Sequence, residues 1–314
     1  MTRRPDSAIV LLVCAFLVPA CALQVPDRPN VVLFIIDDLG WKDLSITGSE
    51  LYETPNIDAL AQGGVRFERF YSDSPVCSPT RAALMTGKHP AALHITNWIG
   101  GDQKGQLIQA EYERQLPLEE ATIGDTFREA GYRTAFIGKW HLGGEGFGPL
   151  AQGFDINVGG HAAGQPASYF WPYKRDGGSP FDVPHLEKGE PGEYLTDRLT
   201  DEAINFIRDS SDQPFFLVLS HYSVHTPIQA KEDITAAIQA RLETNPVCPE
   251  NADTPLFDND PAWSTTRTCQ NNAAYAAMVE STDQSIGRIR ETLSAIGLAE
   301  NTIIFFVSDN GGLS

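Results

Sequence analysis

Cys-Ser-Pro-Thr-Arg-Ala-Ala-Leu-Met-Thr-Gly, residues 77–87, combines a cysteine, a helix-starting proline and an arginine with an apolar run. Pro79 is typical of the first turn of a helix, and Gly87 is typical of a helix end. Cys77 would therefore lie at a helix N-terminus. Unpaired N–H groups there favour an anionic ligand or an ionised sulfur. Without further context, a lone cysteine indicates a small buried residue or half of a disulfide.

Two apolar runs elsewhere predict buried parallel strands that end in oxygen-bearing side chains. The first is Val31–Ile36, and the second is Thr302–Val307. Their β-branched residues and the turn residues around them are typical of such strands. The carboxyl ends of parallel strands meet at one edge of a sheet, where acids commonly hold a hard cation such as Ca²⁺ or Mg²⁺. The candidate ligands at these two ends are Asp37, Asp38, Asp309 and Asn310. For an isolated Asp-Asp pair, a surface turn is the alternative.

A third strand, predicted at Thr134–Ile137, runs into Lys139 and His141. Two residues apart in an extended segment, these side chains project to the same side. A cation and an imidazole directed at one point suit an anion. Taken singly, they would be a solvated lysine and a packed histidine.

A fourth strand, predicted at Pro214–Ser220, delivers two histidines to the same edge, His221 and His225. A histidine at a strand end is suited to proton transfer because its pKa lies near neutrality. We expect His221 to have a packing or supporting role.

The remaining pattern predicts one further strand and several helices that alternate with the strands. The strand is Val65–Tyr71. The first predicted helix begins at Pro55 after the N-cap Thr54, and the second covers about 118–130. The third runs from an N-cap at Thr196–Asp197 to Arg208, and the fourth covers about 271–298. Alternation of this kind is typical of an α/β fold with a parallel sheet between helices.

Taken in order, these motifs resemble those of the formylglycine-dependent sulfatases. The resemblance rests on Cys77-x-Pro79-x-Arg81, on the Lys139 and His141 segment, on His225-Thr-Pro and on Asp309-Asn-Gly. It implies an alkaline-phosphatase-like α/β/α sandwich with a mostly parallel central sheet. It also implies hydrolysis of sulfate esters, with a sulfated carbohydrate or an aryl sulfate as substrate.

The resemblance assigns roles to these residues. Cys77 would be oxidised by a formylglycine-generating maturation enzyme, and the aldehyde hydrate would be the nucleophile, held by Arg81. Lys139 and His141 would bind the sulfate, and His225 would protonate the leaving alcohol. The implied ligands of Ca²⁺ or Mg²⁺ are Asp37, Asp38, Cys77, Asp309 and Asn310.

The sequence departs from the family pattern at two points. Thr80 replaces the more common Ser but keeps the hydroxyl. Family members usually continue past Asp-Asn-Gly with another sulfate-contacting lysine and a small C-terminal domain, whereas this chain stops at Ser314. We therefore expect residues 28–314 to form a catalytic domain without its C-terminal part and small domain.

Two alternative functions stay open on the sequence. A phosphodiesterase or phosphonate hydrolase of the same superfamily could use the same nucleophile and metal. A non-catalytic, metal-binding exported protein would keep Cys77 unmodified.

The N-terminal sequence predicts that the protein is exported. Arg3 and Arg4 precede an apolar run that is too short to span a bilayer well, so residues 1–20 have the layout of a signal peptide. Cys21 resembles a lipoprotein cleavage site, and ordinary cleavage near Ala20 or Ala22 is the alternative. The expected location is the periplasm or the outer surface, with a lipid on Cys21 as the only membrane attachment.

Charge and cysteine content narrow the possible partners further. The formal net charge of −18 argues against nucleic acid or an anionic membrane surface as partner. Cys248 and Cys269 flank a polar segment, and in an exported protein we expect a disulfide between them, with two free thiols as the alternative.

The loop-rich segment 150–192 carries an aromatic patch followed by two cations. Its residues are Tyr169, Phe170, Trp171, Tyr173, Lys174 and Arg175. Such a patch could form a wall for a sugar or aryl group, or it could be ordinary loop packing.

Overall fold

The computed structural model describes residues 28–101, 106–248, 257–260, 264–267 and 269–312. Residues 1–27 lie outside this range, so the predicted signal peptide and the lipidation of Cys21 stay predictions. In the described part of the chain, no helix is both long and apolar enough to cross a bilayer.

Five strands form one parallel sheet in the order β3-β2-β4-β1-β7. Their bounds are Asn30–Ile36 (β1), Arg133–Gly138 (β2), Ile156–Val158 (β3), Phe215–His221 (β4) and Thr302–Ser308 (β7). Since both faces of the sheet are covered by helices, the central strands are continuous apolar runs. The predicted α/β class with a parallel sheet is therefore confirmed.

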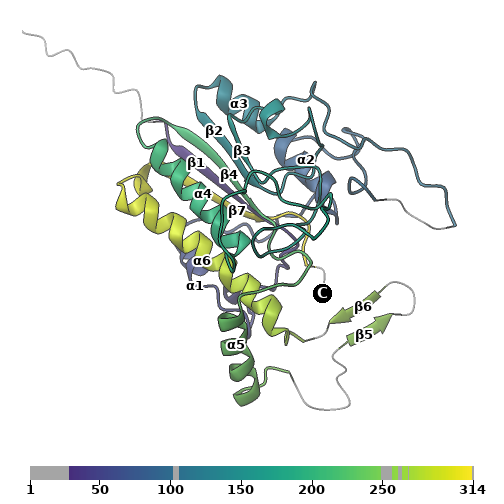
Figure 1. Ribbon diagram of the computed structural model, residues 1–314, viewed down its shortest axis with the longest axis vertical. Coiled ribbons are helices and arrows are strands. Elements are labelled where there is room, and N and C mark those ends of the chain that lie inside the picture. Colours follow the sequence, from purple (N-terminus) through teal and green to yellow (C-terminus); the bar gives the residue numbers. More distant parts are fainter. Residues whose placement is uncertain (1–27, 102–105, 249–256, 261–263, 268, 313–314) are drawn as a thin grey trace, which may run out of the picture.

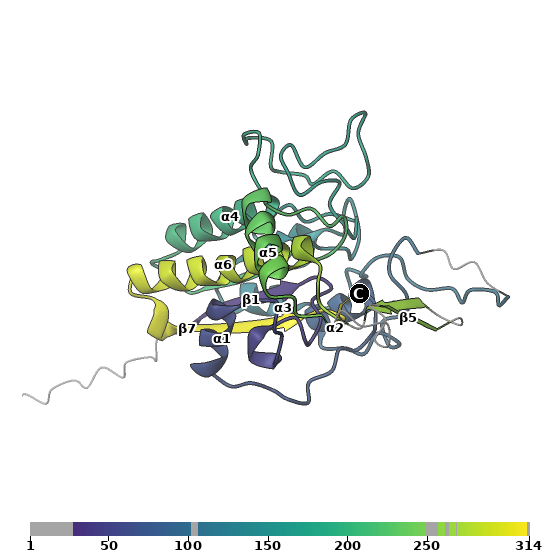
Figure 2. The same ribbon diagram turned by 90° about the horizontal axis from the view of Figure 1, so that it is seen from below.

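Helices pack on both faces of the sheet (Figure 1). They are Pro55–Gln62 (α1), Cys77–Thr86 (α2), Ile123–Glu129 (α3), Leu195–Asp209 (α4), Glu232–Thr244 (α5) and Ala273–Ala295 (α6). Alternate residues of β1 divide the core, with Val32 and Phe34 facing the cluster that includes α4 and α6. Val31 and Leu33 face the cluster that includes α2. Figure 2 shows α4 and α6 side by side along the sheet.

A two-stranded hairpin, Phe257–Asp260 (β5) and Ser264–Arg267 (β6), projects away from the sheet (Figure 1). The chain on either side of it is joined by a disulfide between Cys248 and Cys269, as the sequence predicted.

The predicted strand at Val65–Tyr71 was wrong. This segment is not a strand, and no strand pairs with it in the described part of the chain. Its apolar side chains are exposed, and Phe67 is 73% exposed. Alternating apolar residues favour a strand only where a neighbouring strand accepts their hydrogen bonds.

Two predicted helix starts were also wrong. α3 begins at Ile123 rather than near 118, because Thr122 and Asp125 form a reciprocal capping box. α4 begins at Leu195, with Tyr194 as its N-cap, so Thr196 lies inside the first turn and caps nothing.

Candidate active site

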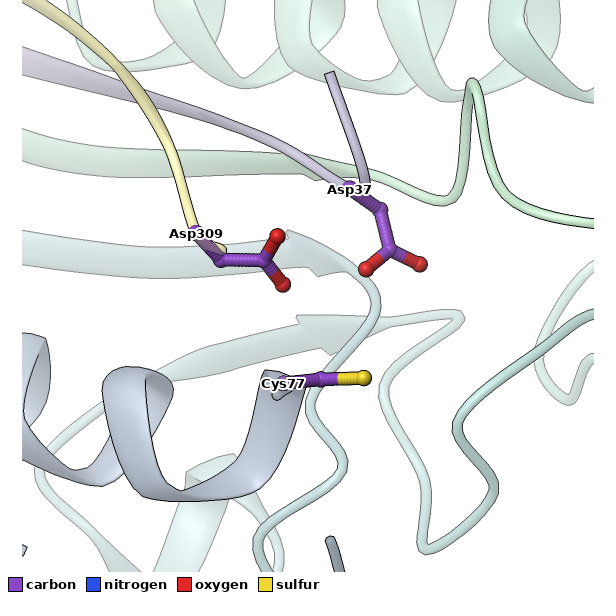
Figure 3. A group of neighbouring side chains, drawn as sticks. All are labelled: Asp37, Cys77 and Asp309. Carbon is purple, nitrogen blue, oxygen red and sulfur yellow. The ribbon is translucent and has the colours of Figure 1, made fainter. Parts of the chain in front are cut away.

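The carboxyl ends of four parallel strands place the predicted site residues at one edge of the sheet. β1 leads to Asp37, β2 to Lys139 and β7 to Asp309, and β4 continues towards His225. Cys77 is the first residue of α2 and points towards the same place. Figure 3 shows Asp37, Cys77 and Asp309 converging from three separate elements.

A buried network of charges lies at the centre of this edge. The ammonium of Lys139 donates to both oxygens of Asp37, at 2.7 and 2.6 Å. Arg81 donates through Nε to Asp309 Oδ2 at 2.9 Å, and its second nitrogen lies 3.3 Å from Asp37 Oδ1. The third nitrogen of Arg81 donates to the Lys139 carbonyl and to Ser220 Oγ, both at 2.8 Å. All three guanidinium nitrogens of Arg81 thus contact groups of the site, and four of its five hydrogens are used.

Burial and neighbouring charges shift the pKa of each member of these pairs. Burial opposes the charge of Lys139, but the facing Asp37 carboxylate outweighs it and raises the pKa of Lys139. Burial likewise opposes ionisation of Asp309, but Arg81 and Lys139 outweigh it and lower the pKa of this carboxyl. Burial raises the pKa of Asp37 against the opposing effects of Lys139 and Arg81, and the neighbouring carboxylates Asp309 and Asp38 add to the rise.

The pKa of the Cys77 thiol lies above its usual range. Burial raises its pKa to about 11, and the carboxylates Asp37 and Asp309 reinforce the shift against Lys139 and Arg81. Burial and the two carboxylates therefore favour the protonated thiol, against the effect expected of a helix N-terminus. An unmodified Cys77 is a poor nucleophile here.

The same edge fits a hard divalent cation. Asp37, Cys77 and Asp309 each offer a ligand atom, and these atoms lie within 4.8 Å of one another. Asp38 Oδ2 and Asn310 Oδ1 are buried and lack any hydrogen-bond partner. The two side chains are held together, because Asn310 Nδ2 donates to Asp38 Oδ1 at 2.7 Å. Unpaired buried oxygens are costly unless a ligand satisfies them, and oxygen donors suit Ca²⁺ or Mg²⁺.

The imidazole of His141 is held in one orientation, and its neutral form is favoured. Its backbone has a φ of 57°, and its Nε2 lies 2.9 Å from the carbonyl oxygen of Ile99. A carbonyl only accepts, so Nε2 carries the hydrogen and Nδ1 is an acceptor. Nδ1 is buried without a partner. Burial, together with Lys139, holds the pKa of His141 well below its usual range.

His225 lies beside the Asp38 and Asn310 pair. Its Nε2 is 3.5 Å from Asp38 Oδ2, and its Nδ1 is 2.8 Å from the Thr226 carbonyl oxygen. Burial lowers the pKa of His225, with a smaller effect from Lys139 in the same direction, while Asp38 opposes both.

Sequence reasoning missed the role of two residues that hold the site. Ser220 Oγ accepts from Arg81 and donates to the Lys139 carbonyl, and Tyr169 Oη lies 2.6 Å from the Tyr222 carbonyl and 2.9 Å from that of His225. Ser220 had only its place at a strand end as a signal. Tyr169 and Tyr173 are fully buried in the core, so for these two the packing interpretation of the aromatic patch is correct.

The other histidine named from the sequence, His221, has a packing role, as expected. It is buried, and its Nε2 lies 2.8 Å from Ser285 Oγ of α6.

Fold and site together define an α/β/α protein with an oxygen-rich polar site at the carboxyl edge of a parallel sheet. The particular family follows from comparison with known proteins. The chain belongs to the sulfatase family, whose model matches residues 29–314.

Individual relatives agree with this assignment. The chain is 31% identical to human N-acetylgalactosamine-6-sulfatase, over 92% of this chain and 51% of that protein. It is 30% identical to a sulfatase of Formosa agariphila, over 91% of this chain and 58% of that protein. The chain therefore spans about half the length of the curated relatives it matches.

A crystal structure of Ps i-CgsB in complex with k-i-k-neocarrahexaose matches the fold. Its TM-score is 0.70 at 28% identity, and the match covers 91% of this chain and 59% of the other. The expected alkaline-phosphatase-like architecture of the sulfatases is thus confirmed.

Proposed function

We propose that this chain carries the catalytic site of a sulfuric ester hydrolase. The observation that carries the proposal is the convergence of Asp37, Cys77 and Asp309 beside the buried cations Arg81 and Lys139. Membership of the sulfatase family supports it. Two fixed cations in a buried site can stabilise the negative charge of a sulfate ester far better than exposed ones.

Cys77 supplies the nucleophile after oxidation to formylglycine by a maturation enzyme. The raised pKa of its thiol supports this, because a protonated, buried sulfur would not attack an ester at neutral pH. A divalent cation, Ca²⁺ or Mg²⁺, would be held by Asp37, Asp38, Asp309 and Asn310 and would neutralise the carboxylates and polarise the nucleophile.

The cations and the neutral histidine bind the reacting groups. Lys139 uses two of its three hydrogens on Asp37, which leaves one for a sulfate oxygen. His141 presents Nδ1 as an acceptor for a hydroxyl of the nucleophile, and Arg81 keeps Asp37 and Asp309 in place.

His225 protonates the alcohol oxygen as its bond to sulfur breaks. Its ring lies against Asp38, which favours the protonated form that an acid needs and so opposes burial and Lys139, which lower the pKa of His225.

A sulfated carbohydrate is the substrate class we propose. Human N-acetylgalactosamine-6-sulfatase, at 31% identity, and the neocarrahexaose complex of Ps i-CgsB support it. In this proposal the protein is exported, as its N-terminal sequence predicts.

The test is turnover by protein co-expressed with a formylglycine-generating enzyme in the presence of Ca²⁺. We expect release of sulfate from N-acetylgalactosamine 6-sulfate and 4-nitrophenyl sulfate, and none from the Cys77→Ala variant. Faster turnover of a phosphate diester than of either sulfate ester would contradict the proposal, as would full activity of Cys77→Ala.

A further inference from the structure

A buried amide lacks a partner close to the proposed site. Among the described residues, the unpaired buried polar atoms include Asp38 Oδ2, His141 Nδ1 and Asn310 Oδ1, which all belong to the site. Another is Nδ2 of Asn97, a residue only 9% exposed. Since nearly all buried donors in folded proteins are paired, this unpaired amide calls for an explanation.

Asn97 begins a loop, residues 97–101, that makes two hydrogen bonds with residues at the site. The backbone N–H of Ile99 donates to Ser78 Oγ at 3.0 Å, and Ser78 directly follows Cys77. The Ile99 carbonyl accepts from His141 Nε2 at 2.9 Å. The 97–101 loop therefore lies against both the start of α2 and the histidine of the site.

The loop holds its one tryptophan in a fixed orientation. Trp98 is 44% exposed, and its indole packs on Gly101, where an added Cβ would lie 2.5 Å from the ring. Tyr112 Oη lies 2.9 Å from the carbonyl oxygens of both Trp98 and Gly101. Asn97 Oδ1 accepts from the Trp98 N–H at 2.9 Å, so the amide oxygen is used and only the amide nitrogen is free.

We infer that the 97–101 loop binds the sugar that carries the sulfate ester. The indole of Trp98 stacks on the apolar face of the ring, and Asn97 Nδ2 donates to a ring hydroxyl. An aromatic face with a neutral amide donor suits an uncharged sugar surface rather than a second anion. The inference rests on the proposed function and adds to it the element that recognises the alcohol side of the ester.

The experiment uses the chain expressed without a maturation enzyme, so that Cys77 stays a thiol and the sugar is not consumed. Calorimetric titration with Ca²⁺ present measures the binding of two probes, N-acetylgalactosamine 6-sulfate and inorganic sulfate. Trp98→Ala and Asn97→Ser are compared with the wild type, and Phe67→Ala serves as the control because it removes another exposed aromatic ring. Asn97→Ser removes the amide donor but keeps a hydroxyl acceptor beside the Trp98 N–H.

We expect the wild type to bind the sulfated sugar more tightly than sulfate. Trp98→Ala and Asn97→Ser should each lower the affinity for the sulfated sugar by about tenfold or more. The affinity for sulfate should stay unchanged, because the lost contacts are made only with the sugar. Phe67→Ala leaves both affinities unchanged.

Three results would overturn the inference. Unchanged sugar affinity in both loop variants would show that the loop does not contact the sugar, while the proposed function would stand. Equal loss of sulfate and sugar affinity would show that the loop only supports the site. If the wild type bound neither probe, the inference and the proposed function would both fail.

Discussion

Gly164 packs against the imidazole of His141 so closely that no side chain fits between them. A Cβ at Gly164 would lie 2.3 Å from His141 Cε1 and 2.6 Å from its Nδ1. Gly164→Ala should therefore displace the ring and lower sulfate ester turnover by about tenfold or more, since a small displacement of a reacting group is costly.

Turnover and the urea midpoint of the Gly164→Ala variant check this prediction. Gly144→Ala is the matched control, because its new Cβ meets only Ala162, at an ordinary 3.5 Å. Equal turnover in both variants would show that the position of His141 is not critical.

His221 should make the fold sensitive to acid. Burial lowers its pKa to about 3 in the folded protein, whereas an unfolded histidine titrates near 6.5. The folded state excludes a proton that the unfolded state takes up below pH 6.5. This part of the stability is complete above pH 6.5 and is lost as the pH falls towards 3, by about 2 kcal/mol at pH 5.

Urea unfolding at pH 7.5 and pH 5 measures this loss. His221→Gln should lose less stability between the two pH values than the wild type, while the exposed His89→Gln should behave like the wild type. An identical pH dependence in all three proteins would contradict the assignment.

At the residue scale, the sequence located the site but not its contacts. Asp37, Lys139 and Asp309 follow apolar runs, and parallel strands bring such residues to one edge. Which carboxylate pairs with which cation depends on side-chain directions that no local pattern encodes. The raised pKa of the Cys77 thiol also escapes local patterns, because it comes from burial and from carboxylates distant in sequence.

At the scale of elements, one carboxylate of α6 fixes the start of α1. Asp283 accepts from the backbone N–H groups of Asn56 and Ile57, at 3.0 and 2.8 Å, and from Asn56 Nδ2 at 2.7 Å. Asp283→Ala leaves these donors buried without an acceptor, so we expect a loss of about 2–3 kcal/mol of unfolding free energy.

Urea unfolding of the Asp283→Ala variant tests this expectation. Asp233→Ala removes an exposed carboxylate from the first turn of α5 and should change stability by less than about 0.5 kcal/mol. A loss for Asp283→Ala no greater than that of the control would show that α1 does not depend on this contact.

The elements that sequence reasoning missed carry weak signals. β3 has three residues, which is too short for a periodicity to show. α5 buries only Ile238, so it lacks the apolar stripe that identified α6. The erroneous strand at Val65–Tyr71 had the opposite problem, because its pattern was clear but its partner was absent from the described residues.

At the scale of the whole molecule, β7 is an apolar edge strand that, within the described residues, pairs only with β1. Ile303 and Phe305 on this strand are 45% and 50% exposed. Unpaired edges with apolar side chains favour association with other chains.

Phe305→Lys should therefore reduce self-association of this chain, because a charge on the edge strand opposes strand pairing. Sedimentation velocity over a range of protein concentrations measures the effect. Ala299→Lys, which adds the same single positive charge at an exposed residue just before the strand, is the control. Equal sedimentation of the wild type and the Phe305→Lys variant at all concentrations would contradict a role for this edge.

The conversion of Cys77 to an aldehyde is the central claim for the whole protein. The most direct test is peptide mass spectrometry across Cys77 in protein co-expressed with a formylglycine-generating enzyme. We predict a peptide about 18 Da lighter than the cysteine form, because oxidation replaces the thiol by the aldehyde that supplies the nucleophile. An unmodified thiol in every such preparation would contradict the proposed mechanism.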